Sequence, residues 1–461
     1  MKMSAVLGLL LSSPFTCLAF AHCEPIKLLG SDTTADDRFG VSVAIDGNIA
    51  VIGAYLNDSN GPNCGTAYVY ELSGSRWFER RKLTPSDASP GDQFGRSVAV
   101  YGNTIVVGSY LADTNKTDTG AAYVFTRSGD VWTQYQKLTA SDANTGDKFG
   151  GSVSISNDTI VVGAYGDDEY RGSAYVFTRT ASVWSEQQKL TASDACQNDN
   201  FGCSVAIDAN TIIVGAYNHD HPGYQDAGSV YVYERQGTTW TQQDILHASD
   251  SSEAARFGYS VALDGNWAVI GAYECDINGV SDTGAAYVFA KADANWIEQQ
   301  KLFDANNPNI GDDFGRSVAI EGDTILAGCP YYVLDGNQTG AVFEFVRSDS
   351  TWVQQDRLTA PDANKDDGFG SSVSLSAGRL IVGSPYDDDA GLDSGSAYIF
   401  GNAVAADFDA DCDVDFFDFA VLADSWLQND PLRDIAPPPA GDGIVDIKDL
   451  AVLCDNWLAG K

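Results

Sequence analysis

The sequence is poor in basic residues. It has 27 Lys and Arg against 64 Asp and Glu, which gives a formal net charge of -37. Nucleic acids and anionic membrane surfaces both require a basic face, so neither is an expected partner. Beyond the N-terminal segment the chain also lacks an apolar run long enough to span a bilayer, so no membrane insertion is expected. Such an acidic chain favours cations, or partners that carry basic patches.

Residues 1–21 have the pattern of a secretory signal peptide. Lys2 precedes a short apolar run, and Ala19-Phe20-Ala21 forms an A-x-A cleavage site. The sequence therefore predicts a secreted protein that is extracellular or at the cell surface.

Cysteine usage leaves two alternatives open. The chain has nine cysteines, and removal of Cys17 with the signal leaves an even number, which allows disulfides in an exported protein. The first pairs to consider are Cys196 with Cys203 and Cys412 with Cys454. Alternatively, Cys203 and Cys329 are buried free thiols, because other copies of a repeat described next have Ser, Ala or Arg at their positions.

A Phe-Gly pair recurs seven times at steps of 55, 55, 52, 56, 57 and 55 residues. A period this regular indicates one supersecondary unit copied seven times. The pairs begin at Phe39, Phe94, Phe149, Phe201, Phe257, Phe314 and Phe369.

Each repeat contains the pattern of four short strands. In the third copy, residues 149–155 alternate, residues 159–163 are almost continuously apolar, and residues 173–177 and 184–190 read as two further strands. Four short antiparallel strands per repeat are typical of a propeller blade. The sequence therefore predicts an all-β, seven-bladed β-propeller over residues 22–400.

The count of fourth strands indicates how the ring closes. Seven Phe-Gly pairs are present, but only six copies have the fourth strand that begins with Trp, and the last copy stops after its third strand. An isolated fourth-strand sequence, residues 26–29, precedes the first copy. We therefore expect this N-terminal strand to complete the last blade and hide the sheet edges of an open array.

The Phe-Gly starts, combined with Gly-Ala-Tyr, Gly-Cys-Pro or Gly-Ser-Pro at the end of the second strand, resemble the FG-GAP repeat of integrin alpha-subunit propellers. The resemblance covers residues 22–400. Integrin-type repeats often carry a D-x-D-x-D-G calcium loop between strands one and two. Here that connection is only a tight turn, such as Asp46-Gly47, so calcium within the blades does not follow from the resemblance.

Strand order places the long, Asp-rich connections between strands two and three, and between strand four and the next blade, on one face. Loops on a rigid scaffold are where binding residues concentrate, so this acidic face is the expected recognition surface for a polysaccharide or a protein. Aspartates that recur in most blades are expected to be structural, by accepting loop N–H bonds. They include Asp87, Asp92, Asp142, Asp147, Asp194 and Asp199.

Other residues of this face are more specific. The tyrosines after Gly-Ala or Gly-Ser are expected to pack between blades, with sugar stacking as the alternative: Tyr55, Tyr110, Tyr165, Tyr217 and Tyr273. His219-Asp220-His221 is a weak candidate for a metal site. Asp387, Asp389 and Asp393 in the last blade are candidates for a surface cation.

A linker at residues 401–406 separates the repeats from a second domain, residues 407–461, which contains its own duplication at an offset of 31. Each half is an acidic loop followed by an amphipathic helix. The first loop has the EF-hand spacing of calcium ligands, with the position-7 carbonyl from Asp413. We expect one strong calcium site there and a weak or absent one in the second loop. The predicted ligands are Asp407, Asp409, Asp411, Asp413, Asp415 and Asp418 in the first loop, and Asp442, Asp446 and Asp449 in the second.

Two calcium-loop–helix units in tandem resemble a type I dockerin. The resemblance implies docking to a cohesin-like module on a scaffold or cell surface. It assigns partner contacts to loop positions 10 and 11, which are Phe416, Phe417, Ile447 and Lys448 in this chain.

The sequence thus favours a non-catalytic binding or adhesion protein that a calcium-dependent tail attaches to an assembly. The alternative is a polysaccharide-degrading glycosidase or lyase delivered by its dockerin. No nucleophile–base pair stands out from the repeats, so no catalytic residue is assigned. A third option is a structural adhesion protein whose tail binds within the same molecule.

Overall fold

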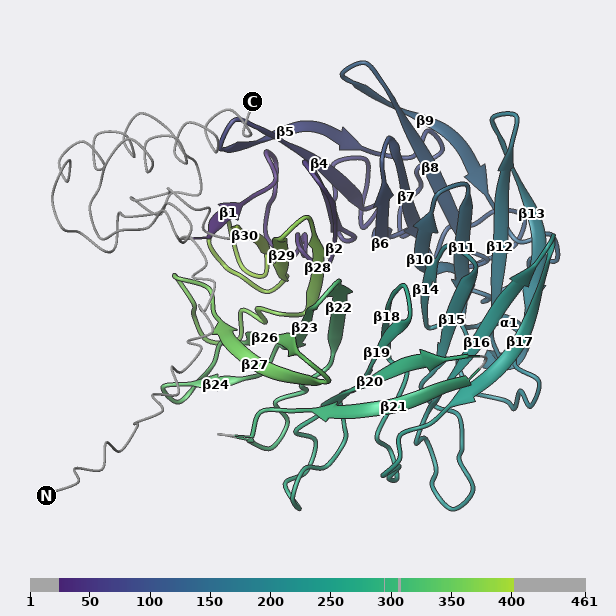
Figure 1. The fold of residues 1–461 in the computed structure, drawn as a ribbon. Coiled ribbons are helices and arrows are strands. Elements are labelled where there is room, and N and C mark those ends of the chain that lie inside the picture. Colours follow the sequence, from purple (N-terminus) through teal and green to yellow (C-terminus); the bar gives the residue numbers. More distant parts are fainter. Residues whose placement is uncertain (1–24, 294, 306–307, 402–461) are drawn as a thin grey trace, which may run out of the picture.

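The fold is a closed ring of seven four-stranded antiparallel sheets, seen in the computed structural model of the chain (Figure 1). The structure describes residues 25–293, 295–305 and 308–401. Within the first six blades the strands lie in sequence order, from the innermost near the ring axis to the outermost at the rim. The predicted all-β, seven-bladed propeller is therefore confirmed.

The first six blades each contain four strands in chain order. Blade 1 has β2 (Ser42–Asp46), β3 (Ile49–Ala54), β4 (Thr66–Ser73) and β5 (Arg76–Leu83); blade 2 has β6 (Phe94–Tyr101), β7 (Thr104–Ser109), β8 (Ala121–Ser128) and β9 (Val131–Leu138); blade 3 has β10 (Phe149–Ser156), β11 (Thr159–Ala164), β12 (Ser173–Thr180) and β13 (Val183–Leu190). Blade 4 has β14 (Ser204–Asp208), β15 (Thr211–Ala216), β16 (Ser229–Gln236) and β17 (Thr239–Leu246); blade 5 has β18 (Ser260–Asp264), β19 (Trp267–Ala272), β20 (Ala285–Ala292) and β21 (Asn295–Leu302); blade 6 has β22 (Ser317–Glu321), β23 (Thr324–Cys329), β26 (Ala341–Ser348) and β27 (Thr351–Leu358).

Blade 7 is built from both ends of the described chain. It contains β28 (Ser372–Ser376), β29 (Arg379–Ser384) and β30 (Ser396–Gly401), and its fourth strand is β1 (Ile26–Leu28). β1 pairs with β30 in antiparallel register, with Lys27 opposite Tyr398. The N-terminal strand therefore closes the ring, as the sequence predicts.

Two short elements in the loops were not expected from the sequence. The loop between β11 and β12 contains α1 (Asp167–Tyr170), and a two-stranded hairpin of β24 (Val333–Leu334) and β25 (Asn337–Gln338) follows β23. Among the described residues, no helix has the length and apolar character that crossing a membrane would require.

The repeat signature is explained by a close approach of neighbouring blades. A Cβ on Gly163, at the end of β11, would lie 2.0 Å from the carbonyl oxygen of Gly202, which belongs to the Phe-Gly pair of the next blade. The Ser152 hydroxyl donates to that same oxygen at 2.9 Å. Only glycine permits this contact, so the motif fixes each blade against the next. The same serine bond occurs at all seven interfaces, from Ser42, Ser97, Ser152, Ser204, Ser260, Ser317 and Ser372.

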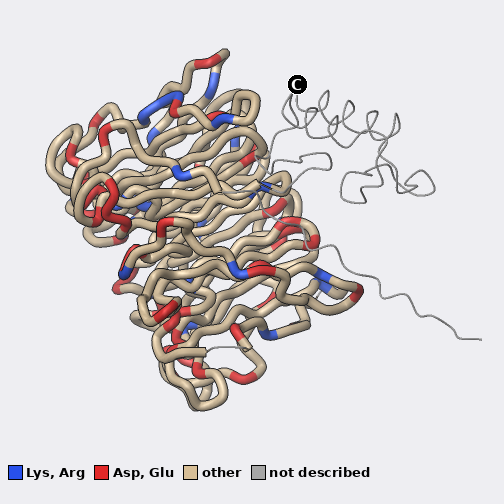
Figure 2. The backbone as a smooth tube through the Cα atoms, turned by 90° about the vertical axis from the view of Figure 1, so that its left-hand side faces the viewer, with Lys and Arg blue, Asp and Glu red and all other residues tan. Residues whose placement is uncertain are grey.

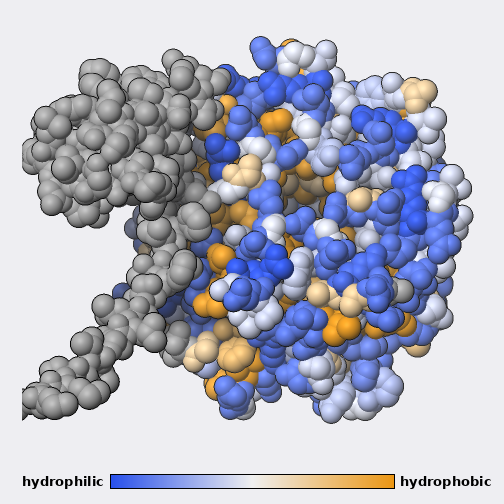
Figure 3. Space-filling view, in the orientation of Figure 1, coloured by the Kyte–Doolittle hydropathy of each residue, from blue (hydrophilic) through white to orange (hydrophobic). Residues whose placement is uncertain are grey.

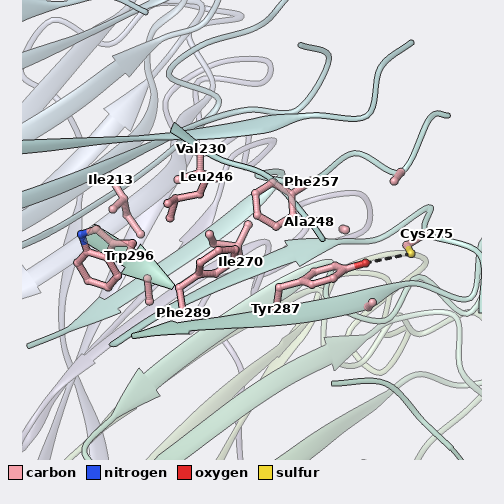
Figure 4. Close-up of a cluster of buried hydrophobic side chains, with 14 of the residues drawn as sticks. Ile213, Val230, Leu246, Ala248, Phe257, Ile270, Cys275, Tyr287, Phe289 and Trp296 are labelled. Atoms are coloured by element: carbon pink, nitrogen blue, oxygen red, sulfur yellow. Dashed lines mark hydrogen bonds between the residues drawn. The ribbon is translucent and has the colours of Figure 1, made fainter. Parts of the chain in front are cut away.

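The hydrophobic core consists of seven clusters, each between two adjacent blades. Figure 4 shows the cluster between blades 4 and 5, where Phe257 and Phe289 pack edge to face with ring centroids 6.0 Å apart. Val230 and Leu246 enter this cluster from blade 4, and Trp296 enters it from blade 5. Because the apolar area is shared between blades, each blade depends on both neighbours for stability.

The five described cysteines are all free thiols. The expected pair of Cys196 with Cys203 is therefore wrong. Cys203 is half-buried and donates to the carbonyl oxygen of Gly215, whereas Cys196 is exposed on a loop. The alternative of a buried free thiol is confirmed for Cys329, whereas Cys203 is free but only half-buried. Cys412 and Cys454 lie outside the described residues.

Candidate binding face and axial pocket

The two faces of the ring are built from different connections. In blade 1, the loop between β3 and β4 contacts the loop that enters blade 2. The Gln93 amide donates to the Asn63 carbonyl, and the Phe94 amide donates to the Cys64 carbonyl. On the opposite side, the Gly102 amide of one tight turn donates to the Asp46 carboxylate of the preceding blade's turn. We call these sides the loop face and the turn face. The predicted loop placement is confirmed.

One set of recurring aspartates on the loop face is structural, as expected. Asp92, Asp147 and Asp199 are buried, and each carboxylate accepts the backbone amide of the residue three positions earlier, at 2.5–2.8 Å. Burial raises the pKa of each of these carboxyls, although the amide bonds partly offset it. These aspartates hold the loop that enters each blade.

A second set of recurring aspartates is also structural, but through side chains rather than loop amides. Asp142 accepts Lys189 at 2.7 Å and the Tyr175 hydroxyl at 2.8 Å. Burial opposes ionisation of Asp142, but these two bonds outweigh it and lower its pKa. Asp87 accepts Lys137 in the same way, and Asp194 accepts Tyr231. Figure 2 shows the resulting mixture of acidic and basic residues along the loops.

The candidate surface-cation residues surround a lysine. The Lys27 ammonium lies 2.7 Å from Asp362, 2.8 Å from Asp387 and 2.5 Å from Asp389. Burial alone would lower the pKa of Lys27, but its three carboxylate partners outweigh burial and raise it. Asp393 is not part of this group and pairs with Arg38 at 3.0 Å. The closing strand thus places a positive charge among the acidic residues of blade 7.

Blade 4 departs from the other blades by collecting three histidines. The Ser229 hydroxyl lies 2.9 Å from His219 Nδ1 and 3.0 Å from His247 Nδ1, and the His221 and His247 rings are 4.5 Å apart. Burial lowers the pKa of His247, and its two imidazole neighbours lower it further. The sequence analysis singled out His219 and His221 but not His247. His247 follows β17 and approaches the other two histidines only in the folded blade.

This histidine group does not provide a three-ligand metal set. Across the described part of the chain, three potential ligand atoms come within 4.8 Å of one another only at Asp362, Asp387 and Asp389. Asp220, the middle residue of the candidate motif, instead accepts the Asp226 amide and shapes the loop.

The loop face opens into a pocket on the ring axis. The cavity has a volume of about 280 Å³, and its lining residues come from blades 2 to 7: Arg96, Tyr110, Gly151, Tyr165, Cys203, Tyr217, Tyr259, Arg316 and Ser371. Tyr110, Tyr165 and Tyr217 belong to the tyrosine series that follows the second strand. Figure 3 shows that hydrophilic residues cover most of the described surface in this orientation, with hydrophobic residues visible between the blades.

The axial tyrosine Tyr217 packs between blades, as the sequence predicts, and also lines the pocket. Tyr217 and Tyr259 of adjacent blades pack edge to face at 5.5 Å, which confirms packing between blades. The same side chains line the pocket, so their remaining surface is available to a ligand. The Arg316 guanidinium lies between Tyr259 and Tyr273, at 5.0 Å and 4.8 Å from the ring centroids, and pairs with Asp313 at 3.1 Å.

The sequence did not identify the arginines of this pocket. Arg96 and Arg316 each follow a Phe-Gly pair, at a position where the other blades have Val41, Gly151, Cys203, Tyr259 and Ser371. The sequence signal that could have identified these arginines is the variation at this one position of an otherwise constant repeat.

Asp313 should make stability depend on pH. Burial raises its pKa to about 7, which Arg316 only partly offsets. The folded state therefore binds the Asp313 proton more tightly than the unfolded state does, so this contribution to stability is complete below the unfolded pKa and is lost as pH rises through about 7. We expect the free energy of unfolding of wild type, relative to Asp313→Asn, to fall by about 2–4 kcal/mol between pH 4 and pH 8.

Denaturant unfolding of both chains across this pH range measures the effect. Asp349→Asn is the matched control, because Asp349 is exposed and has a similar positive φ of 55°, against 57° for Asp313. A difference between wild type and Asp313→Asn that stays constant with pH would contradict the assignment.

Several predicted residues lie outside the described part of the chain. They are the signal peptide at 1–21, the linker beyond Gly401, and the calcium-loop and partner residues of 407–461, which include Asp407, Asp418, Phe416, Phe417, Ile447 and Lys448. The calcium, cohesin and secretion assignments remain predictions.

Comparison with known proteins identifies two similarities. The FG-GAP repeat model matches seven segments, at residues 24–70, 77–125, 132–177, 184–233, 240–289, 296–345 and 352–400. The chain is also 31% identical to human integrin alpha-11 over 178 residues, which cover 35% of this chain and 14% of that protein.

Proposed function

Because the chain belongs to the FG-GAP repeat family, we propose that it is a secreted, non-catalytic binding or adhesion protein. Its integrin-alpha-like propeller is consistent with such a role. Since the matched region is only 14% of integrin alpha-11, the function of that whole protein is not transferred. The ligand is a polysaccharide or a protein, and the loop face is the recognition surface.

The observation that carries this proposal is that the recurring and the blade-specific residues of the loop face have different surroundings. The aspartates shared by most blades are engaged in holding loops and lysines, as Asp92 and Asp142 illustrate. The residues that differ between blades instead gather at the axial pocket, where Arg96 and Arg316 lie among tyrosines. A constant scaffold that presents variable residues in a cavity is the usual construction of a binding site.

Attachment is the second half of the proposal. Residues 407–461 form a calcium-dependent, dockerin-like tail that docks the propeller to a cohesin-like scaffold or cell-surface protein. The acidic loop supports this, because its carboxylates repel one another strongly unless a cation binds between them. Phe416, Phe417, Ile447 and Lys448 are the proposed contacts with the partner.

A glycan and protein array with the full chain, together with a reducing-sugar assay, tests the recognition half. We expect selective binding without turnover. Release of reducing ends from any glycan would reject the non-catalytic assignment in favour of a glycosidase, and unsaturated products would indicate a lyase.

Calcium calorimetry tests the attachment half. The full chain should bind calcium with at least one strong site, and a variant with Asp407→Ala and Asp418→Ala should lose it. A chain with Asp130→Ala is a suitable control, since Asp130 is fully exposed on the turn face. Equal calcium affinity in all three chains would eliminate the assigned loop.

A further inference from the structure

The axial pocket contains an arginine without an acidic partner. Three other arginines of the loop face near the axis each contact a carboxyl group: Arg38 contacts Asp393 at 3.0 Å, Arg256 contacts Glu274 at 3.0 Å, and Arg316 contacts Asp313 at 3.1 Å. Arg96, by contrast, pairs with no carboxylate of the described residues. Its guanidinium lies 5.9 Å from the centroid of the Tyr110 ring, and the side chain is half-buried.

Lys148 adds a second unneutralised charge beside the same pocket. Its ammonium is 5.2 Å from the centroid of Tyr165 and 5.3 Å from that of Tyr170, and it forms no ion pair within the described ranges. Tyr165 lines the pocket next to Arg96. Burial raises the pKa of Tyr165, and Lys148 and Arg96 both counteract it, which places the two cations within electrostatic reach of one ring.

The lysines near the ends of the fourth strands contact carboxylates, as Lys189 and Lys301 do, whereas Arg96 and Lys148 lie beside one cavity without such a contact. Two half-buried cations that face only aromatic rings are instead placed to receive an anion from outside. Guanidinium binds carboxylates through two parallel hydrogen bonds, so a carboxylate is the matching anion.

We infer that the axial pocket binds a uronic acid residue of a polysaccharide, with Arg96 holding the carboxylate and Lys148 strengthening the local positive field. This inference rests on the proposed binding function and narrows its ligand. The volume of about 280 Å³ is at the small end for ligand pockets, so it admits a single sugar unit. Tyr110, Tyr165 and Tyr217 offer faces for the C–H surface of the ring and hydroxyls for its polar edge.

The net charge limits the kind of polysaccharide. A densely charged polyanion would be repelled by a chain of formal charge -37, whereas one carboxylate on a mostly neutral glycan would meet the local positive field first. Screening at physiological salt confines the repulsion to about 8 Å, so a terminal or isolated uronate fits best.

Calorimetric titration of the full chain with glucuronate, with glucose, and with N-acetylglutamate tests the inference. We expect glucuronate to bind about tenfold or more tightly than glucose, and more tightly than N-acetylglutamate. Arg96→Gln should weaken glucuronate about tenfold, and Lys148→Gln several-fold. Lys116→Gln is the control, because Lys116 is an exposed loop-face lysine whose ammonium contacts only Ala143 and Asn144. It should bind as wild type does.

Three outcomes would overturn the inference: equal affinity for glucuronate and glucose, unchanged binding in Arg96→Gln, or tighter binding of N-acetylglutamate, which would indicate an acidic protein side chain as the ligand. The glycan and protein array separates this inference from the broader proposal. If Arg96→Gln keeps the array binding of wild type, recognition stands and the axial site is rejected. If wild type binds nothing on the array but still binds glucuronate, the proposal that the protein recognises a polysaccharide or protein is rejected, whereas the axial carboxylate site is kept.

Discussion

A chain that lacks residues 25–30 should lose the stable closed ring, with a melting temperature lower by about 5–10 °C or more. The deletion removes β1, whose Leu28 is buried between blades 7 and 1, and the lysine that pairs with three aspartates. It also leaves β30 as an exposed sheet edge, which favours pairing with other molecules. Calorimetry and size-exclusion chromatography measure the two effects.

This deletion distinguishes a strand that closes the ring from an N-terminal extension that makes no structural contact. Loss of an N-terminal extension that paired with nothing would leave the melt unchanged and the chain monomeric. Unchanged melting with monomeric elution would therefore contradict closure by β1.

Replacing Lys27 alone should also be strongly destabilising. Lys27→Met keeps the length of the side chain but leaves Asp362, Asp387 and Asp389 without their cation, and Asp387 is buried. We expect a loss of roughly 2–4 kcal/mol in the free energy of unfolding, somewhat less than for a fully buried pair because Asp362 and Asp389 are partly exposed. Denaturant unfolding at pH 7 measures this loss.

Lys82→Met is the matched control for Lys27→Met. Lys82 occupies the same position in blade 1 but pairs with a single, half-exposed carboxylate, Asp32, so its replacement should cost about 1 kcal/mol or less. Calcium should restore part of the stability of Lys27→Met only, since a cation can then enter among its three carboxylates. Equal losses in the two variants would show that the group around Lys27 has no special role in closure.

The sequence predicted the fold well because the fold is repetitive. The Phe-Gly pair and the glycine at the end of the second strand recur in all seven blades, and the Trp-led fourth strand recurs in six, so weak signals reinforce one another. Closure was predictable for the same reason, since Lys27-Leu28 copies the Lys-Leu end of the other fourth strands.

The candidate site was less predictable because it depends on contacts between distant repeats. Arg96 and Arg316 are separated by four blades of sequence, yet both line one cavity. Lys27 meets Asp387 across 360 residues, and this contact fills the place where the sequence alone suggested a cation. Such neighbours follow from the closed ring and not from any local pattern.

The abundance of acidic residues does not by itself indicate the ligand chemistry of the axial pocket. Carboxylates dominate the loop face, but recurring ones such as Asp92 and Asp142 are engaged by backbone amides, lysines or tyrosines. The charges left without a partner at the axis are positive. The functional inference therefore depends on which charges are already neutralised, which sequence composition cannot show.

Hydrogen exchange of residues 396–401 tests ring closure most directly, and the axial pocket requires that closure. In the closed ring residues 397–399 of β30 lie between β29 and β1, so their amides should exchange as slowly as those of β8 and β12, the third strands of blades 2 and 3. Fast exchange at alternate amides of β30, as expected for an edge strand, would contradict closure and the pocket that depends on it.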